Sequence, residues 1–336
     1  MDNLKKLKIG VVAGGISSER DISLKSGKAV HESLSKNGFS SKLIDIKSKE
    51  QLKSLETYKG LDLVFIMIHG KGGEDGEIQS ILKKAKIKYT GSNATSSRRA
   101  FDKVKSKEIF KKNGLEVPFY EIHWFDEFEY EGKIYYSLFA EEAFEYSYEI
   151  DRFVVKPSKE GSSYGVSIVN RPGMTWFDED EDGLITGLDS DLKEALLKAD
   201  SYDGEIMVED FIEGKELTVA IVGENTYPAI EIIPPNEFYD FSAKYDGIGT
   251  KYIPAKLTSK ETKKLSELCL KAFKSLGCSG WGRVDLIKSK DDGNYYILEV
   301  NTVPGMTETS LVPKAAKLAG LSFNDLLVEI IKASID

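Results

Sequence analysis

The chain has 336 residues, of which 41% are hydrophobic and 30% are charged, and its formal net charge at pH 7 is −9. These values are ordinary for a soluble protein of two or three domains, and the acidic balance does not favour a nucleic-acid partner. We expect no membrane-spanning segment and no signal peptide, because the apolar runs are too short. Two cysteines without metal-ligand spacing are typical of a reducing, cytoplasmic setting.

The first part of the chain alternates strands and helices. We predict strands at residues 7–13, 41–46, 61–68 and 87–90, a helix that ends at Gly38, and a second helix at about 77–85. This alternation predicts an open parallel α/β domain over residues 1–92. His69 and the glycine-rich segment 70–76 follow the third strand, at the sheet edge where such folds bind ligands.

Residues 93–207 are expected to form a second unit. It would contain one helix over residues 97–113 and strands near 119–123, 153–156 and 166–169. Between the last two strands lies Gly161-Ser162-Ser163-Tyr164-Gly165, whose backbone N–H groups can wrap phosphate oxygens, with Lys156 adding positive charge. An ordinary turn would have the same composition, so this segment alone decides nothing. The acidic stretch 171–190 is predicted to be a solvated loop.

Residues 208–336 are expected to form the third unit. We predict strands at 216–222 and 229–233, a helix over 259–276, and a final helix from about Phe323. The irregular segment 234–253 is typical of a lid. Near the start of this unit, Glu209 offers an acceptor, and Phe211 and Ile212 offer apolar cover for a nucleoside, although a plain edge strand would look similar.

Two short strands near the C-terminus, 282–286 and 297–301, are joined by a run of turn formers. A register symmetric about Asp292 places four polar side chains on one face, because strand side chains alternate: Asp285 opposite Glu299 and Arg283 opposite Asn301. The other face is predicted to be a core face, carrying Val284, Leu286, Leu298 and Val300.

The polar face of this hairpin has the chemistry of a cation site. Two carboxylates and an amide oxygen suit Mg²⁺, and Arg283 beside them is suited to gripping a carboxylate or a phosphate. A half-exposed hairpin with a solvated polar face has the same alternation. The hairpin alone therefore leaves both interpretations open.

Taken together, these motifs resemble the D-alanine–D-alanine ligase family of the ATP-grasp superfamily. The resemblance covers nearly the whole chain in the family's order, at residues 14–23, 69–76, 102–103, 156–163, 238–245, 280–285, 299–307 and 310–313. It implies an α/β (α+β ATP-grasp) fold, in which the N-terminal domain is followed by two α+β subdomains, 93–207 and 208–336, that clasp ATP between them.

The resemblance also implies a reaction. ATP phosphorylates the carboxylate of a first D-alanine, the amine of a second D-alanine attacks the acyl phosphate, and phosphate leaves. The product is D-alanyl-D-alanine, a peptidoglycan precursor. ATP and D-alanine are the implied ligands, Mg²⁺ (two ions, with Mn²⁺ as a substitute) is the implied metal, and a homodimer is the implied assembly.

Residue roles follow from the same resemblance. The implied catalytic residues are Glu19, Ser162, Tyr245 and Arg283, and the implied substrate contacts are His69, Gly305, Ser310 and Leu311. The implied ATP contacts are Lys103, Lys156, Ser163, Glu209, Phe211, Ile212, Glu216, Phe238, Lys244 and Leu298. The implied metal ligands are Asp285, Glu299 and Asn301. Glu19, Ser162 and Tyr245 are expected to form a hydrogen-bonded latch over the site.

Two other functions remain open from the sequence. One is a ligase that joins D-alanine to D-lactate, D-serine or another amino acid. The presence of Tyr245 favours the dipeptide instead, because the resemblance associates a depsipeptide product with changes at this position. The other is a non-catalytic nucleotide-binding protein on this fold. The joint presence of Arg283, Asp285, Glu299 and Asn301 argues against that second alternative.

Overall fold

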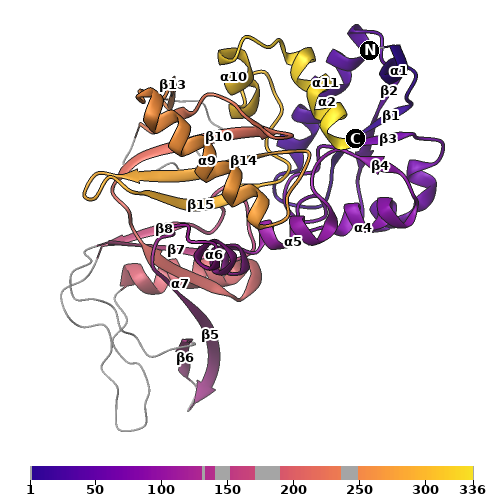
Figure 1. Cartoon of the computed structure of the whole chain (residues 1–336). Coiled ribbons are helices and arrows are strands. Elements are labelled where there is room, and N and C mark those ends of the chain that lie inside the picture. The colour runs from indigo at the N-terminus through magenta and orange to yellow at the C-terminus, as the bar shows by residue number, and fades with distance from the viewer. Residues whose placement is uncertain (1, 131–132, 141–151, 171–189, 236–248, 336) are drawn as a thin grey trace. The chain divides into compact units, whose positions relative to one another are not determined.

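The structure is a computed structural model that describes residues 2–130, 133–140, 152–170, 190–235 and 249–335. The chain divides into two compact units (Figure 1). Unit 1 comprises Met1–Val117, Gly214–Pro235 and Gly249–Asp336, and unit 2 comprises Pro118–Glu213 and Asn236–Ile248. The finer division of the chain at residues 92 and 207 stays a prediction.

Unit 1 begins with a parallel sheet, as predicted. Its strands are β1 (Ile9–Gly14), β2 (Ser41–Ile46), β3 (Leu63–Ile66) and β4 (Lys88–Tyr89), in the order β2-β1-β3-β4. The surrounding elements are α1 (Asp2–Lys5), α2 (Arg20–Lys36), α3 (Lys49–Lys53), η1 (Leu55–Tyr58) and α4 (Glu77–Lys84). The inner strands β1 and β3 are buried along their whole length, because neighbouring strands and helices cover them.

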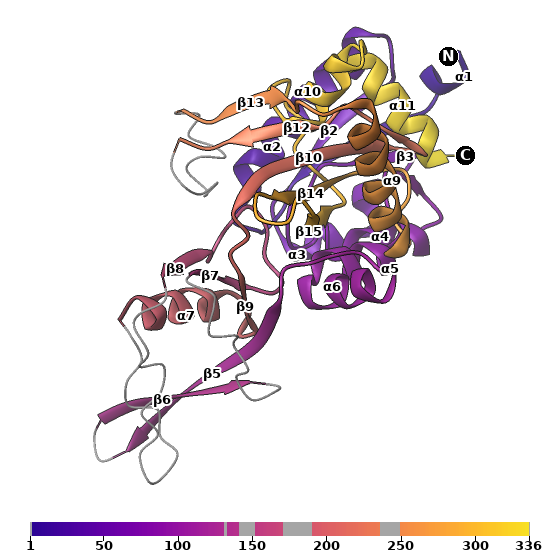
Figure 2. The same ribbon diagram turned by 60° about the vertical axis from the view of Figure 1, so that its left-hand side comes forward.

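An antiparallel sheet forms the other part of unit 1. Its strands are β10 (Gly214–Val222), β11 (Asn225–Thr226), β12 (Ile230–Ile233), β13 (Lys251–Pro254), β14 (Trp281–Ser289) and β15 (Tyr295–Asn301). The order is β13-β12-β10-β14-β15, with β11 paired to β10. Helix α9 (Ser259–Ser275) packs on β10, β14 and β15 (Figure 2), and a capping box of Thr258 and Glu261 starts it.

Of the two C-terminal helices, the last one returns to the parallel sheet. Helix α10 (Leu311–Leu318), which was not predicted, contacts β10, and α11 (Phe323–Ile335) packs against α2 and β4 (Figure 1). Residues from both ends of the chain thus share one core, which includes Val30 and Leu34 of α2 and Leu327 and Ile331 of α11.

The prediction of a single helix over residues 97–113 is wrong. The structure has two helices, α5 (Ala94–Phe101) and α6 (Lys103–Lys112), separated at Asp102. Asp102 is extended, with φ −85° and ψ 102°, and its carboxylate accepts a hydrogen bond from the Lys105 N–H. The aspartate therefore caps a new helix instead of continuing the old one. This break makes Lys103 the first residue of α6.

The described part of unit 2 is a five-stranded antiparallel sheet with one helix on it. The strands are β5 (Tyr120–Tyr130), β6 (Lys133–Ala140), β7 (Arg152–Pro157), β8 (Ser167–Asn170) and β9 (Ile206–Asp210), in the order β6-β5-β9-β7-β8. Helix α7 (Ser190–Asp203) packs on β7, β8 and β9, and its Leu196 and Ala199 are fully buried there. Strand β6 and α7 were not predicted, and the acidic stretch 171–189 lies outside the described residues.

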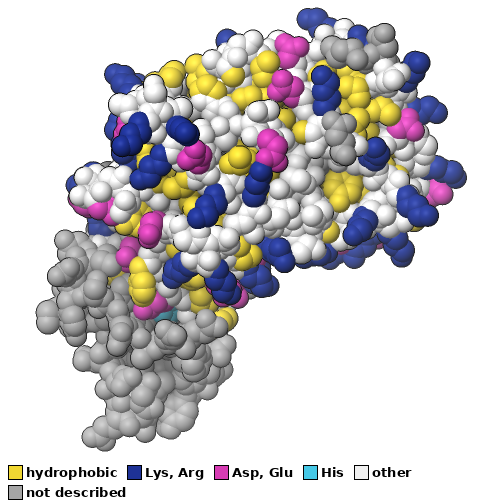
Figure 3. Space-filling view, viewed as in Figure 1, with side chains coloured by type: hydrophobic (Ala, Val, Ile, Leu, Met, Phe, Trp, Pro, Cys, Tyr) yellow, Lys and Arg dark blue, Asp and Glu magenta, His cyan; other side chains and the backbone are white. Residues whose placement is uncertain are grey.

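The surface in Figure 3 carries charged side chains of both signs, with hydrophobic side chains in separate groups among them. Large exposed hydrophobic residues of the described part are far apart in sequence: Ile16, Leu43, Leu55, Phe119, Ile233 and Leu318. None of the helices over the described ranges is long and apolar enough to cross a membrane.

Candidate active site

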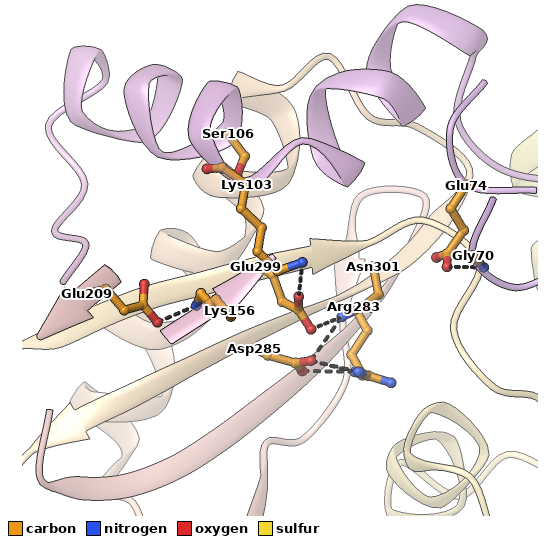
Figure 4. Close-up of polar contacts among 10 residues, drawn as sticks. All are labelled: Gly70, Glu74, Lys103, Ser106, Lys156, Glu209, Arg283, Asp285, Glu299 and Asn301. Atoms are coloured by element: carbon orange, nitrogen blue, oxygen red, sulfur yellow. Dashed lines mark hydrogen bonds and ion pairs between the residues drawn. The ribbon is translucent and has the colours of Figure 1, made fainter. Parts of the chain in front are cut away.

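The β14–β15 hairpin has the predicted register at its polar end. Asp285 pairs with Glu299 and Arg283 pairs with Asn301, so the four side chains lie on one face of the sheet (Figure 4). Val284 and Val300 point to the opposite face and are buried. The alternation of the sequence therefore placed this polar cluster correctly.

The register shifts by one residue next to this cluster. After the Asp285–Glu299 pair, Leu286 pairs with Ile297, so that Leu298 is the extra residue of a β-bulge. Ile297 takes the core position and is fully buried, whereas Leu298 is half-buried. The prediction of Leu298 on the core face is wrong because a bulge removes one step of the alternation. Its predicted contact with ATP is compatible with this change of environment and stays a prediction.

Asp285 accepts hydrogen bonds from three neighbouring side chains. Arg283 donates from Nε to Oδ1 at 2.8 Å and from its terminal nitrogen to Oδ2 at 2.6 Å. Thr218 of β10 donates to Oδ1 at 2.6 Å, and the Asn301 amide donates to Oδ2 at 2.9 Å. Only 7% of Asp285 is exposed, so these donors take the place of water as its hydrogen-bond partners.

Glu299 lies beside Asp285 and faces the start of α6. Its Oε2 is 3.8 Å from the Lys103 Nζ, and its Oε1 accepts a hydrogen bond from the Asn301 amide at 3.3 Å (Figure 4). Lys103 reaches this position because the cap at Asp102 starts α6 there. The cluster thus has two neighbouring acids, Asp285 and Glu299, flanked by the basic groups of Arg283 and Lys103.

The donor set of this cluster fits a divalent cation that also binds a nucleotide. Among the described residues, no group of three or more His, Cys, Asp or Glu side chains is arranged to hold a metal. Asp285 and Glu299 are two adjacent carboxylates, and the Asn301 amide contacts both, so its oxygen can replace its nitrogen there by a rotation of the amide. Mg²⁺ commonly takes one or two carboxylates and fills its remaining positions with phosphate oxygens and water.

His69 is buried, and both of its ring nitrogens are engaged. Nδ1 lies 2.7 Å from the Val303 carbonyl oxygen, which requires an N–H there, and Nε2 lies 3.2 Å from the Ser26 hydroxyl. Burial and, to a lesser extent, the Arg283 charge lower the pKa of His69 to about 4. The imidazole is therefore neutral at pH 7. Ser26 also accepts a hydrogen bond from the Met306 N–H, so His69 and Ser26 together hold the segment 303–306.

Glu74 holds the same segment from a second side. Its carboxyl accepts hydrogen bonds from the Gly70 N–H at 2.9 Å and from the Val303 N–H at 3.0 Å. Burial, followed by the negative charges of Glu19 and Glu299, raises the pKa of Glu74 to about 8. Glu19 is 5% exposed at the N-terminus of α2, and a side chain at Gly70 would approach it to 2.6 Å. A side chain at position 70 would therefore displace the Glu19 carboxylate from this place.

The segment 303–306 contains Gly305 and is followed in the chain by the other predicted substrate contacts, Ser310 and Leu311. Ser310 is the N-cap residue of α10, and its hydroxyl accepts a hydrogen bond from the Thr307 N–H. Leu311 is the first residue of that helix and is 8% exposed. A Cβ at Gly305 would approach the Ser310 hydroxyl to 3.1 Å. Backbone N–H groups at a helix start are suited to a carboxylate.

In unit 2 the structure pairs two of the predicted ATP contacts. Lys156 of β7 forms an ion pair with Glu209 of β9, the neighbouring strand, and both side chains are buried (Figure 4). Phe211 follows β9, its N–H donates to the Arg152 carbonyl, and its ring lies 4.3 Å below the Arg152 guanidinium. Ile212 beside it is half-buried.

The glycine–serine turn, residues 161–165, joins β7 and β8. Ser162 and Ser163 both have positive φ, at 52° and 59°, and Gly165 follows at 71°. Residues other than glycine seldom adopt this conformation, which tends to occur at functional sites. Tyr164 lies beside Tyr202 of α7, with ring centroids 6.2 Å apart. The contact between these two tyrosines therefore anchors the turn on α7.

The remaining predicted site residues fall into two groups. Glu216 of β10 is half-buried and lies on the same face of its strand as Thr218. Phe238, Lys244 and Tyr245 lie outside the described residues, so the predicted latch and lid are not described.

Three polar side chains in unit 1 were missed by the sequence reasoning. Thr218 binds Asp285, Ser26 binds His69, and Glu74 binds the Val303 N–H. Ser26 and Thr218 lie inside regular elements and carry no local signal. Glu74 lies in the glycine-rich segment already singled out, and that segment was the available clue.

Comparisons with known proteins match this chain to the family that its motifs resemble. A family model described as D-ala D-ala ligase C-terminus matches residues 186–332, and one described as D-ala D-ala ligase N-terminus matches residues 46–92. A D-alanine–D-alanine ligase from Pseudoalteromonas translucida is 39% identical over 98% of this chain and 97% of its own length. One from Trichlorobacter lovleyi is 41% identical over 98% and 95%, respectively.

Solved structures are similar over the same extent. The D-alanine–D-alanine ligase from Bacillus anthracis complexed with ATP is 30% identical, with a TM-score of 0.75, over 98% of this chain and 97% of that one. The VanG D-Ala:D-Ser ligase from Enterococcus faecalis is 27% identical, with a TM-score of 0.74, over 98% and 99%. These full-length matches show that the chain belongs to the D-alanine–D-alanine ligase family and has the ATP-grasp fold.

Proposed function

We propose that this protein joins two D-alanine molecules into D-alanyl-D-alanine, with conversion of ATP to ADP and phosphate, to supply a peptidoglycan precursor. The observation that carries the proposal is the 39–41% identity to four D-alanine–D-alanine ligases over nearly the whole chain. The polar face of the β14–β15 hairpin supports it, because it retains the residue types that phosphoryl transfer requires.

In this proposal ATP is bound by two sets of residues. In unit 1 these are Lys103, Glu216 and the partly exposed Leu298, and in unit 2 they are Lys156, Ser163, Glu209, Phe211 and Ile212. Because the Phe211 N–H already binds the Arg152 carbonyl, adenine would use the Phe211 carbonyl and the Ile212 N–H. Phe238 and Lys244 complete the proposed set.

We assign the divalent cation to Asp285, Glu299 and Asn301. A bound Mg²⁺ supplies positive charge that neutralises phosphate oxygens during transfer. The cluster suits this cation because its two carboxylates lie side by side, with the Asn301 amide touching both.

The first D-alanine is assigned to the region around Glu19. The Glu19 carboxylate, buried beside Glu74, would hold the ammonium group, and a cation there would offset the negative charge that helps raise the pKa of Glu74. Arg283, together with the Gly305 N–H, would bind the tetrahedral oxyanion and border the second D-alanine. A preorganised donor of this kind is worth about 10²–10³ in rate.

The neutral imidazole of His69 would contribute orientation rather than charge. Its two hydrogen bonds hold the backbone that carries Gly305. Ser310 and Leu311 would bind the carboxylate of the second D-alanine at the start of α10. Closure by Ser162 and Tyr245 would keep water from the acyl phosphate.

A D-alanine–D-serine ligase is the second candidate. The structural comparison favours this candidate. This chain matches the VanG D-Ala:D-Ser ligase with a TM-score of 0.74, which is close to its TM-score of 0.75 with the Bacillus anthracis D-alanine–D-alanine ligase. The higher identities, of 39–41%, to D-alanine–D-alanine ligases favour the dipeptide.

The test is release of ADP from ATP and Mg²⁺ with D-alanine alone, with D-alanine plus D-serine, and with D-alanine plus D-lactate, with products identified by mass spectrometry. Release with D-alanine alone and formation of the dipeptide support the proposal. Release only with a mixed pair would instead support the second candidate, and no release with any pair would support a nucleotide-binding protein.

We also propose a homodimer in the cytoplasm. Light scattering on the purified chain tests the assembly, for which a single monomer mass at micromolar concentration would contradict the dimer. Fractionation of the source cells tests the compartment.

A further inference from the structure

A buried threonine lies next to the proposed cation site and has no role in the assignments above. Thr218 is on β10, directly opposite Asp285 on β14 in the antiparallel register. Only 2% of Thr218 is exposed, and its hydroxyl donates a hydrogen bond of 2.6 Å to Asp285 Oδ1. Because the hydroxyl is buried and its partner is a carboxylate, this hydrogen bond is a strong one.

Thr218 and Asn301 bind different oxygens of Asp285, whereas Arg283 binds both. Oδ1 receives the Thr218 hydroxyl and the Arg283 Nε, at 2.6 and 2.8 Å. Oδ2 receives the Arg283 terminal nitrogen at 2.6 Å and, on the β15 side, the Asn301 amide at 2.9 Å. Oδ2 is therefore the oxygen of Asp285 that contacts Asn301, another proposed cation ligand.

We propose that Thr218 is a positioning residue that holds the Asp285 carboxylate so that Oδ2 is presented to a divalent cation. This inference rests on the proposed function, in which Asp285, Glu299 and Asn301 bind that cation. It adds a residue from a third strand, β10, to the two strands that carry the ligands.

The rigidity of Thr218 is what suits it to this task. An aspartate rotates freely about its last side-chain bond, and so its carboxylate needs a fixed donor. Arg283 is a long, flexible side chain that can follow the carboxylate as it turns. Threonine is β-branched and stiff at χ1, and β10 lies inside the sheet between β12 and β14. Thr218 is thus the donor that sets the orientation of the carboxylate.

The experiment compares two pairs of proteins that each differ by one hydroxyl: wild type with Thr218→Val, and Thr218→Ser with Thr218→Ala. Free Mn²⁺ is counted by electron paramagnetic resonance as the metal is titrated into each protein without substrates. Loss of an outer hydrogen bond to a metal ligand typically costs about 10–100-fold in metal affinity. We expect that loss for the Val and Ala variants and retention of affinity in the Ser variant.

Thr90→Val is the matched control, because Thr90 is also 2% exposed and its hydroxyl is bonded to the Ile66 N–H. It should leave the Mn²⁺ affinity unchanged. Equal affinities within both Thr218 pairs, or an equal loss in the control, would overturn the role of Thr218. A wild-type protein that binds no Mn²⁺ would overturn the proposed cation site itself, and this inference with it. If Thr218→Val does not fold, the Ser and Ala pair carries the comparison.

Discussion

Two polar segments with similar predicted roles, the β14–β15 hairpin and the glycine–serine turn, are built in different ways. In the hairpin a regular ladder places Arg283 and Asp285, and neighbouring side chains then bond to them. In the turn the backbone itself is unusual, because Ser162 and Ser163 have positive φ. The comparison teaches that a strand presents side chains at little conformational cost, whereas a turn of this kind presents backbone N–H groups at the cost of strain.

The strongest test of the hairpin is Asp285→Ala. The variant leaves the guanidinium of Arg283, which is largely buried, without its carboxylate. Breaking a buried ion pair in this way costs about 3–5 kcal/mol, and we expect that loss in the free energy of unfolding. Urea denaturation measures it. Asp291→Ala, in the exposed turn of the same hairpin, is the control and should have little effect.

Arg283→Lys separates charge from geometry in the hairpin. Lysine keeps the positive charge but cannot make the two parallel hydrogen bonds to Asp285. We expect kcat for ADP release to fall by about 10²–10³, because an oriented donor to the oxyanion is lost. Unchanged kcat in a correctly folded variant would contradict the assigned role.

The raised pKa of the buried Glu74 should make the stability of the protein depend on pH. Its pKa is raised from 4.5 to about 8 by burial and neighbouring acids, so between these values the native state holds a proton that the unfolded state has lost. Stability therefore falls as pH rises through this window, by at most about 1.4 kcal/mol per pH unit.

The lowered pKa of His69 has the opposite effect on stability, which it makes fall as the pH decreases, but only below pH 6.5. Its pKa is lowered to about 4, so protonation of the unfolded state removes stability as the pH falls from 6.5 to 4. The effect of Glu74 is therefore measured best between pH 6.5 and 8. In that range Glu74→Gln should remove part of the slope of unfolding free energy against pH, and equal slopes would refute the raised pKa.

Ser26→Ala tests the hydrogen bonds that hold the segment 303–306. It removes the hydroxyl that bonds to the Met306 N–H and to His69 Nε2, which costs about 1–3 kcal/mol in unfolding free energy. Ser106→Ala is a matched control, because that serine is also fully buried but bonds only to the Lys103 carbonyl of its own helix. A similar loss in both variants would mean that Ser26 has no special position.

The smallest effect is expected in the turn. Ser163→Gly removes the penalty of a positive φ, although glycine gains entropy in the unfolded chain. We expect a net stabilisation of roughly 0.5–1 kcal/mol, measured by urea denaturation. Ser163→Ala retains the penalty and should give none. A less stable glycine variant would show that the serine side chain outweighs the strain of its backbone.

Much of the local structure followed from the sequence. Alternation in β14 and β15 was enough to place Asp285 opposite Glu299, and the apolar run of β3 was enough to predict a parallel sheet. Both patterns are local, since each reflects the period of one element and the side that is buried. Ordered motifs extended this to the family and to most of the proposed site.

The tertiary structure decided what depends on contacts distant in sequence. The bulge that turns Leu298 away from the core and the cap at Asp102 that starts a second helix both break a local pattern. Thr218 and Ser26 acquire their roles only because folding brings them within hydrogen-bond distance of Asp285 and His69, which lie 67 and 43 residues away. The sequence by itself determined which side chains are available for the chemistry, because side-chain period and motif order are local. Only tertiary packing determined which donors orient them, since a hydrogen bond between strands depends on register and burial.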